Sequence, residues 1–216
     1  MPLWSCIMRL KYALTIGDPR TAQVAAFQSR DTGSSHLSRD DIVASLGIIQ
    51  HRCRPGLTLL YAKYTKDHYA FEQSFQCLLR FAKEQAGRYI GKNAPMGAIR
   101  CLVEFALYDF CRTVDTPGEK CLCQGRGEVR DVKASRRAGK AIMITCRRCK
   151  GTGLRPIVHT RCHQALLAFT SVSQPTYSRK WKPFYEALIT WCHQQESIAE
   201  QCYNAIAGLK TAEITG

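Results

Sequence analysis

Apolar residues recur at helical spacing on both sides of a central region that lacks this pattern. Residues 1–37 show no sustained periodicity and are expected to form a loosely ordered arm. From residue 38 onward, apolar side chains return three and four positions apart, which places them on one face of a helix. The spacing predicts helices at about 39–50, 67–89, 98–114, 157–170, 175–193 and 196–207.

Prolines and glycines punctuate the helical pattern. The dipeptide Pro55-Gly56, the segment 91–95 and the run Asp115-Thr116-Pro117-Gly118 each lie between predicted helices. Residues of these types favour turns and end helices. Pro183 falls inside the predicted helix at 175–193, where it either kinks that helix or begins a new one at its first turn.

Helical periodicity disappears between residues 117 and 155. This region holds six glycines and two short β-prone runs, at 128–132 and 141–145, which predict a small β-ribbon. The whole pattern therefore predicts a mainly α-helical protein, in which a helical domain carries an inserted ribbon. We expect an arm at 1–37, a helical region at 38–116, the ribbon at 117–155 and C-terminal helices at 156–216.

Two cysteine pairs in the ribbon have the spacing of a zinc site. They are Cys121-Leu122-Cys123 and Cys146-Arg147-Arg148-Cys149, and each is followed by the same x-Gly-x-Gly pattern. Four thiolates suit the tetrahedral coordination of structural zinc. We therefore predict one structural Zn²⁺ ion held by Cys121, Cys123, Cys146 and Cys149. Catalysis there is not expected, because four thiolates leave no position for water.

The first cysteine pair is one residue shorter than the usual two-residue spacing. For this reason Cys162, His159 and His163 remain alternatives to Cys121 as the fourth ligand. Of the 12 cysteines in the chain, seven are scattered singly. Single cysteines of this kind need no partner in a reducing compartment, which is the compartment that the pattern favours.

Charge is concentrated in one part of the chain. The formal net charge is +14, and residues 117–183 alone carry 15 basic against three acidic side chains. This concentration indicates a localised surface that binds anions, although a generally solubilising basic surface is the alternative. Within the ribbon, the residues proposed to contact phosphate or RNA are Arg136, Arg137, Arg147 and Arg148. They could equally form a solvated edge.

The residues after the ribbon have the pattern of a helix-turn-helix. A predicted helix from His159 to Ser171 is followed by a short turn, and a second helix opens at Gln174-Pro175-Thr176. In such motifs the second helix presents its first side chains to the major groove of DNA. The expected DNA contacts are Gln174, Thr176, Tyr177, Arg179, Lys180 and Lys182. A plain capped helix in an all-α protein is the alternative.

Other classes of protein are disfavoured. No apolar stretch approaches the roughly 20 residues that a membrane span requires. No phosphate loop, metalloprotease helix or nucleophile elbow occurs, and the helical acids Glu104 and Asp109 lack a paired partner at useful spacing. We therefore do not expect an enzyme or a membrane-bound protein.

Several of these motifs together resemble the late-gene antitermination protein Q family of lambda-type phages. The resemblance is carried by Phe105 to Arg112, Thr116-Pro117-Gly118, the two cysteine and glycine motifs, Ser173 to Arg179 and Lys182-Pro183, and it is most specific over residues 75–208. Weaker similarity includes Asp41 to Gly47. Because Met8-Arg9-Leu10 resembles the start of the family, residues 1–7 are expected to be an extension or a start placed too early.

The resemblance implies a phage or prophage regulator that acts in the bacterial cytoplasm, at the nucleoid. Such proteins bind double-stranded DNA at a late promoter and load onto paused RNA polymerase holoenzyme while sigma is still bound. With assistance from NusA, the polymerase then reads through terminators into late genes, and nascent RNA is a further expected partner. The family's zinc cysteines fall on Cys121, Cys123, Cys146 and Cys149, and its DNA-reading helix begins at Gln174.

Other functions stay open at this point. The main alternative is a zinc-stabilised helix-turn-helix repressor or activator without antitermination activity, which predicts a symmetric dimer. A chaperone-type zinc module and an RNA-only zinc-knuckle protein are weaker alternatives. The acidic positions Glu196 and Glu200 form either a partner surface or a solvated helix face.

Overall fold

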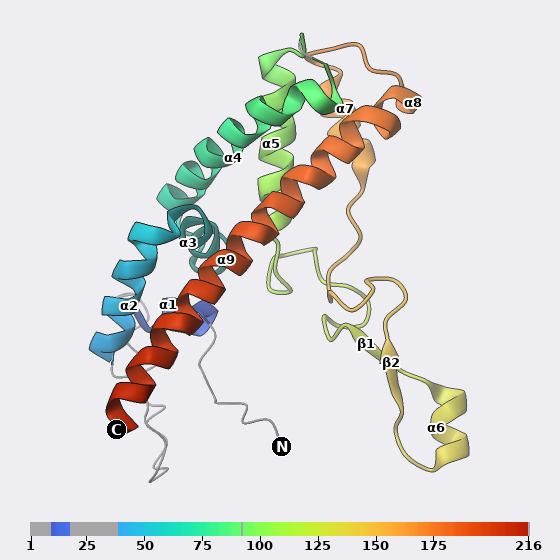
Figure 1. Ribbon diagram of the computed structural model, residues 1–216. Coiled ribbons are helices and arrows are strands. Elements are labelled where there is room, and N and C mark those ends of the chain that lie inside the picture. Colours follow the sequence, from blue (N-terminus) through green and yellow to red (C-terminus); the bar gives the residue numbers. More distant parts are fainter. Residues whose placement is uncertain (1–9, 18–38, 92, 216) are drawn as a thin grey trace. The chain divides into compact units, whose positions relative to one another are not determined.

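The computed structural model describes residues 10–17, 39–91 and 93–215, and it is mainly helical (Figure 1). The chain divides into two compact units. Unit 1 takes its described residues from 1–84 and 186–216, and unit 2 consists of residues 85–185. The helices α4 (His68–Tyr89) and α9 (Lys182–Thr215) each contribute to both units. Within the described residues, no helix is both long enough and apolar enough to cross a membrane.

Unit 1 is built from helices that share one apolar core. Besides parts of α4 and α9, it contains α1 (Leu10–Gly17), α2 (Arg39–Arg52), α3 (Arg54–Leu60) and the π-helical turn η2 (Tyr61–Thr65). The helix α2 carries Asp40 and Asp41 in its first turn, where negative charges stabilise a helix N-terminus. Its apolar stripe joins a core that includes Leu10, Leu14, Ile42, Leu46, Ile49, Leu57, Leu60, Ala199 and Tyr203.

A glycine permits close packing of α3 against α9. A Cβ atom on Gly56 would clash with the backbone oxygen of Gln195 and lie 2.8 Å from the Cβ of Ala199. Pro55 stands in the first turn of α3, where its missing N–H is not needed. The predicted breaker Pro55-Gly56 is therefore part of a helix start and of a helix contact.

The two acids considered as a partner surface are engaged inside unit 1. Lys63 forms an ion pair with Glu196 at 3.1 Å, and the backbone N–H of Leu10 donates to Glu200 at 3.1 Å. Burial opposes the charged form of Glu196, but the neighbouring His193 and Lys63 outweigh burial and lower its pKa. Both acids therefore hold elements of unit 1 together, which corrects the expectation of a partner surface or a solvated face.

Unit 2 holds the inserted ribbon and the helices around it. Its elements are α5 (Met96–Phe110), β1 (Glu128–Arg130), α6 (Val132–Ala138), β2 (Met143–Thr145), α7 (His159–Leu166), α8 (Gln174–Thr176) and the π-helical turn η3 (Tyr177–Trp181), with the ends of α4 and α9. The strands β1 and β2 pair antiparallel, with Val129 opposite Ile144. The apolar side of α5 is buried at Leu102, Val103, Ala106, Leu107 and Phe110.

Several elements differ from the sequence-based expectation. The helix α1 lies inside the predicted arm, and the remaining arm residues fall outside the described part of the chain. The short helix α6, inside the ribbon, was not expected. It is capped by Asp131, whose side chain accepts from the N–H of Ala134 at 3.0 Å, and it ends at Gly139 with a φ of 65°.

The C-terminal helices are continuous rather than broken. The elements α8, η3 and α9 follow one another without a gap from Gln174 to Thr215, so the expected break between 193 and 196 is absent. Pro183 is the second residue of α9, which begins at Lys182 directly after the π-helical turn. A proline in a regular helix clashes with the carbonyl four residues earlier, and here that carbonyl belongs to Arg179, inside the π-helical turn.

Candidate metal centre and nucleic-acid surface

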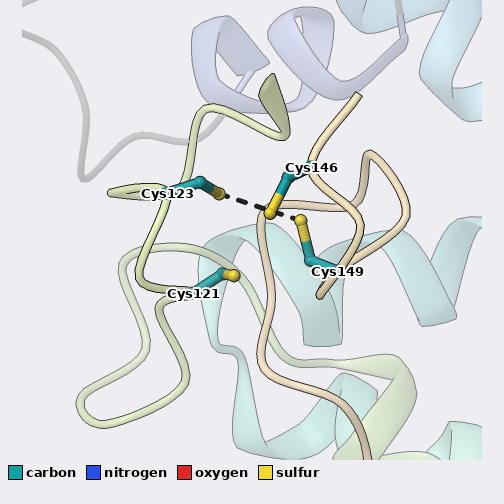
Figure 2. A group of neighbouring side chains, drawn as sticks. All are labelled: Cys121, Cys123, Cys146 and Cys149. Carbon is teal, nitrogen blue, oxygen red and sulfur yellow. Dashed lines mark hydrogen bonds between the residues drawn. The ribbon is translucent and has the colours of Figure 1, made fainter. Parts of the chain in front are cut away.

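The structure brings the four ribbon cysteines together. Figure 2 shows their sulfur atoms turned toward one centre, two from each arm of the ribbon. All four sulfurs lie within 4.8 Å of one another, and those of Cys123 and Cys149 are 3.7 Å apart. A tetrahedron with metal–sulfur bonds of about 2.3 Å has edges of about 3.8 Å. The cluster therefore fits four-coordinate binding of one metal ion.

Cys121 belongs to this cluster despite its short spacing from Cys123. Its side chain is 2% exposed and packs with Cys146 and Cys149. The alternative ligands are occupied elsewhere in unit 2. The Nε2 atom of His163 donates to the carbonyl of Val172 at 2.8 Å, and the Nδ1 atom of His159 lies 3.2 Å from the hydroxyl of Tyr177. Cys162 is buried, and burial raises its pKa to about 11.

Backbone hydrogen bonds cross between the two halves of the ribbon. The N–H of Cys121 donates to the carbonyl of Gly153 at 2.9 Å, and the N–H of Cys146 donates to the carbonyl of Gly127 at 2.8 Å. The arrangement is reciprocal, because each half supplies one cysteine N–H and one glycine carbonyl. It explains why both cysteine motifs carry the same x-Gly-x-Gly continuation.

The last glycine of each motif has no room for a side chain. Gly127 and Gly153 have φ angles of 75° and 74°, a region that residues with a Cβ rarely adopt. A Cβ on Gly127 would clash with the backbone of Gly151, and one on Gly153 would clash with the backbone of Gly125. The two halves thus approach backbone to backbone beside the sulfurs.

The thiols influence one another's ionisation. Burial opposes ionisation of Cys123, but hydrogen bonds from the Gly127 backbone and from the thiols of Cys121 and Cys149 lower its pKa from the ordinary value. The backbone of Cys123 favours the Cys121 thiolate, but burial and the neighbouring thiols outweigh it and raise the Cys121 pKa to about 11. Four thiolates at this spacing would repel one another unless a cation lay between them. The donor set is therefore suited to a bound metal cation.

An ionic network connects the ribbon to the helices of unit 2. Arg112, just after α5, contacts Glu119 at 2.6 Å and the backbone carbonyl of Arg155 at 3.2 Å, which lie at opposite ends of the ribbon. Its Nε atom lies 3.2 Å from Asp109, and Tyr185 of α9 donates to the same carboxylate. Burial raises the pKa of Asp109 to about 6, against the lowering effect of Arg112.

Sequence reasoning did not find this network. In the sequence, Asp109 has no acidic partner at useful spacing, and an acidic pair was the only role considered for it. The available signal was the spacing of Asp109 and Arg112, three residues apart at the end of a helix. The other partners are distant in sequence and could be identified only from the fold.

The segment from α7 to η3 displays most of the residues proposed to contact DNA. Ser173 caps α8, with its side chain accepting from the N–H of Thr176 at 3.4 Å. The side chains of Gln174, Thr176, Arg179 and Lys180 are exposed, and Lys182 is partly buried. Thr176 and Lys180 also border an open hollow of about 400 Å³ beside the α4–α5 loop.

Tyr177 does not belong to this exposed set. Its side chain is 1% exposed, and its ring centroid lies 5.0 Å from that of His163. Its hydroxyl faces His159. The structure therefore corrects the expectation that Tyr177 touches DNA, because packing against the two histidines of α7 buries it.

The ribbon has a strongly basic exterior. Arg136 and Arg137 stand on α6, and Arg147 and Arg148 stand between the cysteines of the second pair, all with exposed side chains. Five further exposed cations accompany them: Arg126, Arg130, Lys133, Lys140 and Lys150. The only acids between 126 and 150 are Glu128 and Asp131. We call these nine cations the ribbon cations.

Comparison with known proteins gives a consistent result. Residues 115–200 match the family model described as antitermination protein Q. The chain is 30% identical over 206 residues to antitermination protein Q of Salmonella phage P22, covering 92% of this chain and 99% of that protein. It is also 30% identical to the proteins of the same name from Escherichia phage HK022 and Escherichia phage lambda, with 100% and 99% of those proteins covered.

Proposed function

The chain belongs to the antitermination protein Q family, and on this premise we propose that it is a transcription antitermination factor of a phage or prophage. In this proposal it binds double-stranded DNA at a late promoter and loads onto paused bacterial RNA polymerase holoenzyme that still carries sigma. The modified polymerase then reads through terminators into late genes. The proposal includes no catalytic activity. Similarity to the Q proteins along 92% of the chain is the observation that carries it.

For DNA recognition we propose the exposed side of α8 and η3, preceded by α7 as the first helix of a helix-turn-helix. Arg179 and Lys180 follow Thr176 by three and four positions, and all three side chains are exposed. An arginine at such a position can bond two acceptors of guanine in the major groove, and lysines bind phosphate. We assign base contact to Arg179, with Gln174 and Thr176 beside it, and phosphate contact to Lys180 and Lys182.

For the metal centre we propose one structural Zn²⁺ held by the four ribbon cysteines. When bound, the ion supplies no chemistry beyond cross-linking the two halves of the ribbon. The 3.7 Å separation between the sulfurs of Cys123 and Cys149 matches the edge of a zinc–thiolate tetrahedron. The thiols of Cys121, Cys123, Cys146 and Cys149 bind the ion, and the glycine backbone beside them fixes the distance between the two cysteine pairs.

For the ribbon cations we propose contact with nucleic-acid phosphates, in nascent RNA or in DNA. Arg136, Arg137, Arg147 and Arg148 project from a small ribbon that has little core of its own. Exposed clusters of one sign attract phosphate and make binding salt-dependent. NusA is proposed as a further partner, and the bacterial cytoplasm as the site of action, because both accompany the family role.

The decisive experiment is transcription in vitro with purified bacterial RNA polymerase holoenzyme. The template carries the promoter region around and just downstream of this gene, followed by an intrinsic terminator. We expect read-through to rise with added protein, and to require the promoter DNA. Arg179→Ala should lose the effect, whereas Arg80→Ala, which removes an exposed arginine of α4 in unit 1, should keep it. Specific DNA binding without added read-through would instead identify a DNA-binding regulator that lacks antitermination activity.

A further inference from the structure

Two cysteines outside the ribbon meet in unit 1. Cys53 stands at the junction of α2 and α3, and Cys202 stands on α9. Their sulfur atoms are 2.6 Å apart, although 149 positions separate them in sequence. This distance is much shorter than the 3.7 Å between the sulfurs of Cys123 and Cys149. A disulfide bond requires about 2.05 Å, so a small approach of the two side chains would suffice.

The surroundings favour a pair of thiols rather than a second metal centre. Cys53 is 7% exposed within the apolar core of unit 1, and Cys202 packs at the edge of that core. Among the described residues, three or more metal-ligating side chains meet only in the ribbon cluster. Two close thiols without further ligands have the arrangement for two-electron oxidation.

We propose that Cys53 and Cys202 form a reversible disulfide when a peroxide oxidises the protein. The sulfur of Cys202 attacks one peroxide oxygen, the O–O bond breaks, and a sulfenic acid and one water result. The sulfur of Cys53 then attacks the sulfenic sulfur, the S–O bond breaks, and a second water leaves with the thiol proton. Two thiols lose two electrons in total, and one hydrogen peroxide becomes two waters. A dithiol reverses the bond by exchange.

The order of attack follows from the positions of the two thiols. Burial raises the pKa of Cys53, and the hydrogen bond with the Cys202 thiol and the negative charge of an ionised Cys202 raise it further, to about 11. Cys53 therefore remains protonated near neutral pH and is a poor first nucleophile. Cys202 is partly exposed whereas Cys53 is buried, so we expect a small oxidant to reach Cys202 first.

The disulfide would join the α2–α3 junction covalently to α9. The cross-link spans the whole of unit 2 in sequence, because residues 85–185 lie between the two cysteines. Closing so long a loop restricts the unfolded chain. We expect the melting temperature of unit 1 to rise by about 5–10 °C on oxidation and to return after reduction.

The test uses the full-length, metal-loaded protein. It is treated with hydrogen peroxide, blocked with N-ethylmaleimide and digested with trypsin. Cleavage gives peptide 53–63, because Arg54 precedes proline, and peptide 181–210, because Lys182 precedes proline. We expect a cross-linked species of these two peptides, 2 Da below their summed mass when Cys192 carries N-ethylmaleimide, that disappears after reduction. Because peptide 181–210 contains both Cys192 and Cys202, fragmentation must place the bond on Cys202.

Matched variants make the assignment specific. Cys202→Ser should abolish the species, whereas Cys77→Ser, which removes a partly buried thiol of α4, should leave it unchanged. Metal release is followed in the same sample with a chromogenic chelator. The proposal is refuted if the cross-link forms only after the ribbon metal has left, or if it involves Cys192. It is equally refuted if peroxide modifies Cys77 while Cys53 and Cys202 stay separate thiols.

Discussion

Loss of one ribbon thiol should remove both the metal and the fold of the ribbon. In Cys149→Ser, one of four sulfurs that lie within 4.8 Å of one another is replaced by a weaker ligand. We expect metal content to fall from one equivalent per chain to none. Unit 1 should keep its structure, because its core contains no residue of the ribbon.

The size of the effect follows from how little else holds the ribbon. Its buried cluster consists of three cysteines, with Cys123 and Val129 packed against them. Half-burying one valine contributes about 1 kcal/mol, whereas a structural zinc ion contributes on the order of 10 kcal/mol. Ordering each residue costs about 1–2 kcal/mol. The ribbon should therefore unfold locally when the metal is absent.

Hydrogen exchange gives a residue-level assay. The N–H groups of Cys121 and Cys146 donate across the ribbon, and both should be protected from exchange in the metal-loaded protein. In Cys149→Ser their exchange should approach the rate of an unfolded chain, while the amides of α2 keep their protection. Cys77→Ser serves as control, because it removes a thiol outside the cluster. Full metal content or preserved protection in Cys149→Ser would show that the metal centre has been misassigned.

Further predictions concern packing, ionisation and DNA. Gly56→Ala should lower the free energy of unfolding by more than about 1 kcal/mol, because the new Cβ clashes with α9. Gly47→Ala places its Cβ with no atom within 4 Å and should raise the free energy of unfolding by about 0.5–1 kcal/mol. Denaturant titration measures both changes, and equal effects of the two variants would contradict the packing of α3 against α9. The pKa of Asp109 is raised from 3.8 to about 6 in the folded protein. Its contribution to the free energy of unfolding is therefore fully present below pH 3.8 and is lost as the pH rises through 6. Asp109→Asn should remove this pH dependence. Melting temperatures of both proteins, measured over this pH range, check the prediction, and a parallel pH dependence of the two would contradict it. Arg179→Ala should relax the sequence preference of DNA binding, whereas Arg147→Ala should lower the affinity for all DNA sequences alike and flatten its salt dependence. Identical behaviour of the two variants would contradict the assignment of base contact to Arg179 and phosphate contact to Arg147.

Local patterns predicted the elements that local forces determine. The helices α2, α4 and α5 were foreseen because each buries an apolar stripe, and their observed bounds differ from the predicted ones by a few residues. The ribbon cysteines were foreseen because chelation of one ion restricts the spacing of its ligands. The small helix α6 has no apolar stripe. It depends on the Asp131 cap and on Gly139, and only a search for caps could have indicated it.

Long-range packing decided the features that the sequence did not predict. Tyr177 lies in a basic run and resembles a surface residue, but α7 supplies two histidines that cover it. The partners of Arg112 are contributed by α5 and both ends of the ribbon. The helices predicted at 175–193 and 196–207 left a break between them. The helix continues there, because Ala199 and Tyr203 on the following turns are buried in unit 1.

The burial of Tyr177 clarifies how the neighbouring basic residues are presented. Tyr177 and Trp181 bound the π-helical turn η3, and both are buried, at 1% and 5% exposure. The three residues between them are exposed. Two aromatic anchors four positions apart thus fix one side of the turn against the protein, and this leaves Arg179 and Lys180 on the other side. Since a backbone held in place loses less conformational entropy on binding than a mobile one, we expect Tyr177 to act by positioning the residues proposed to bind DNA rather than by touching DNA itself.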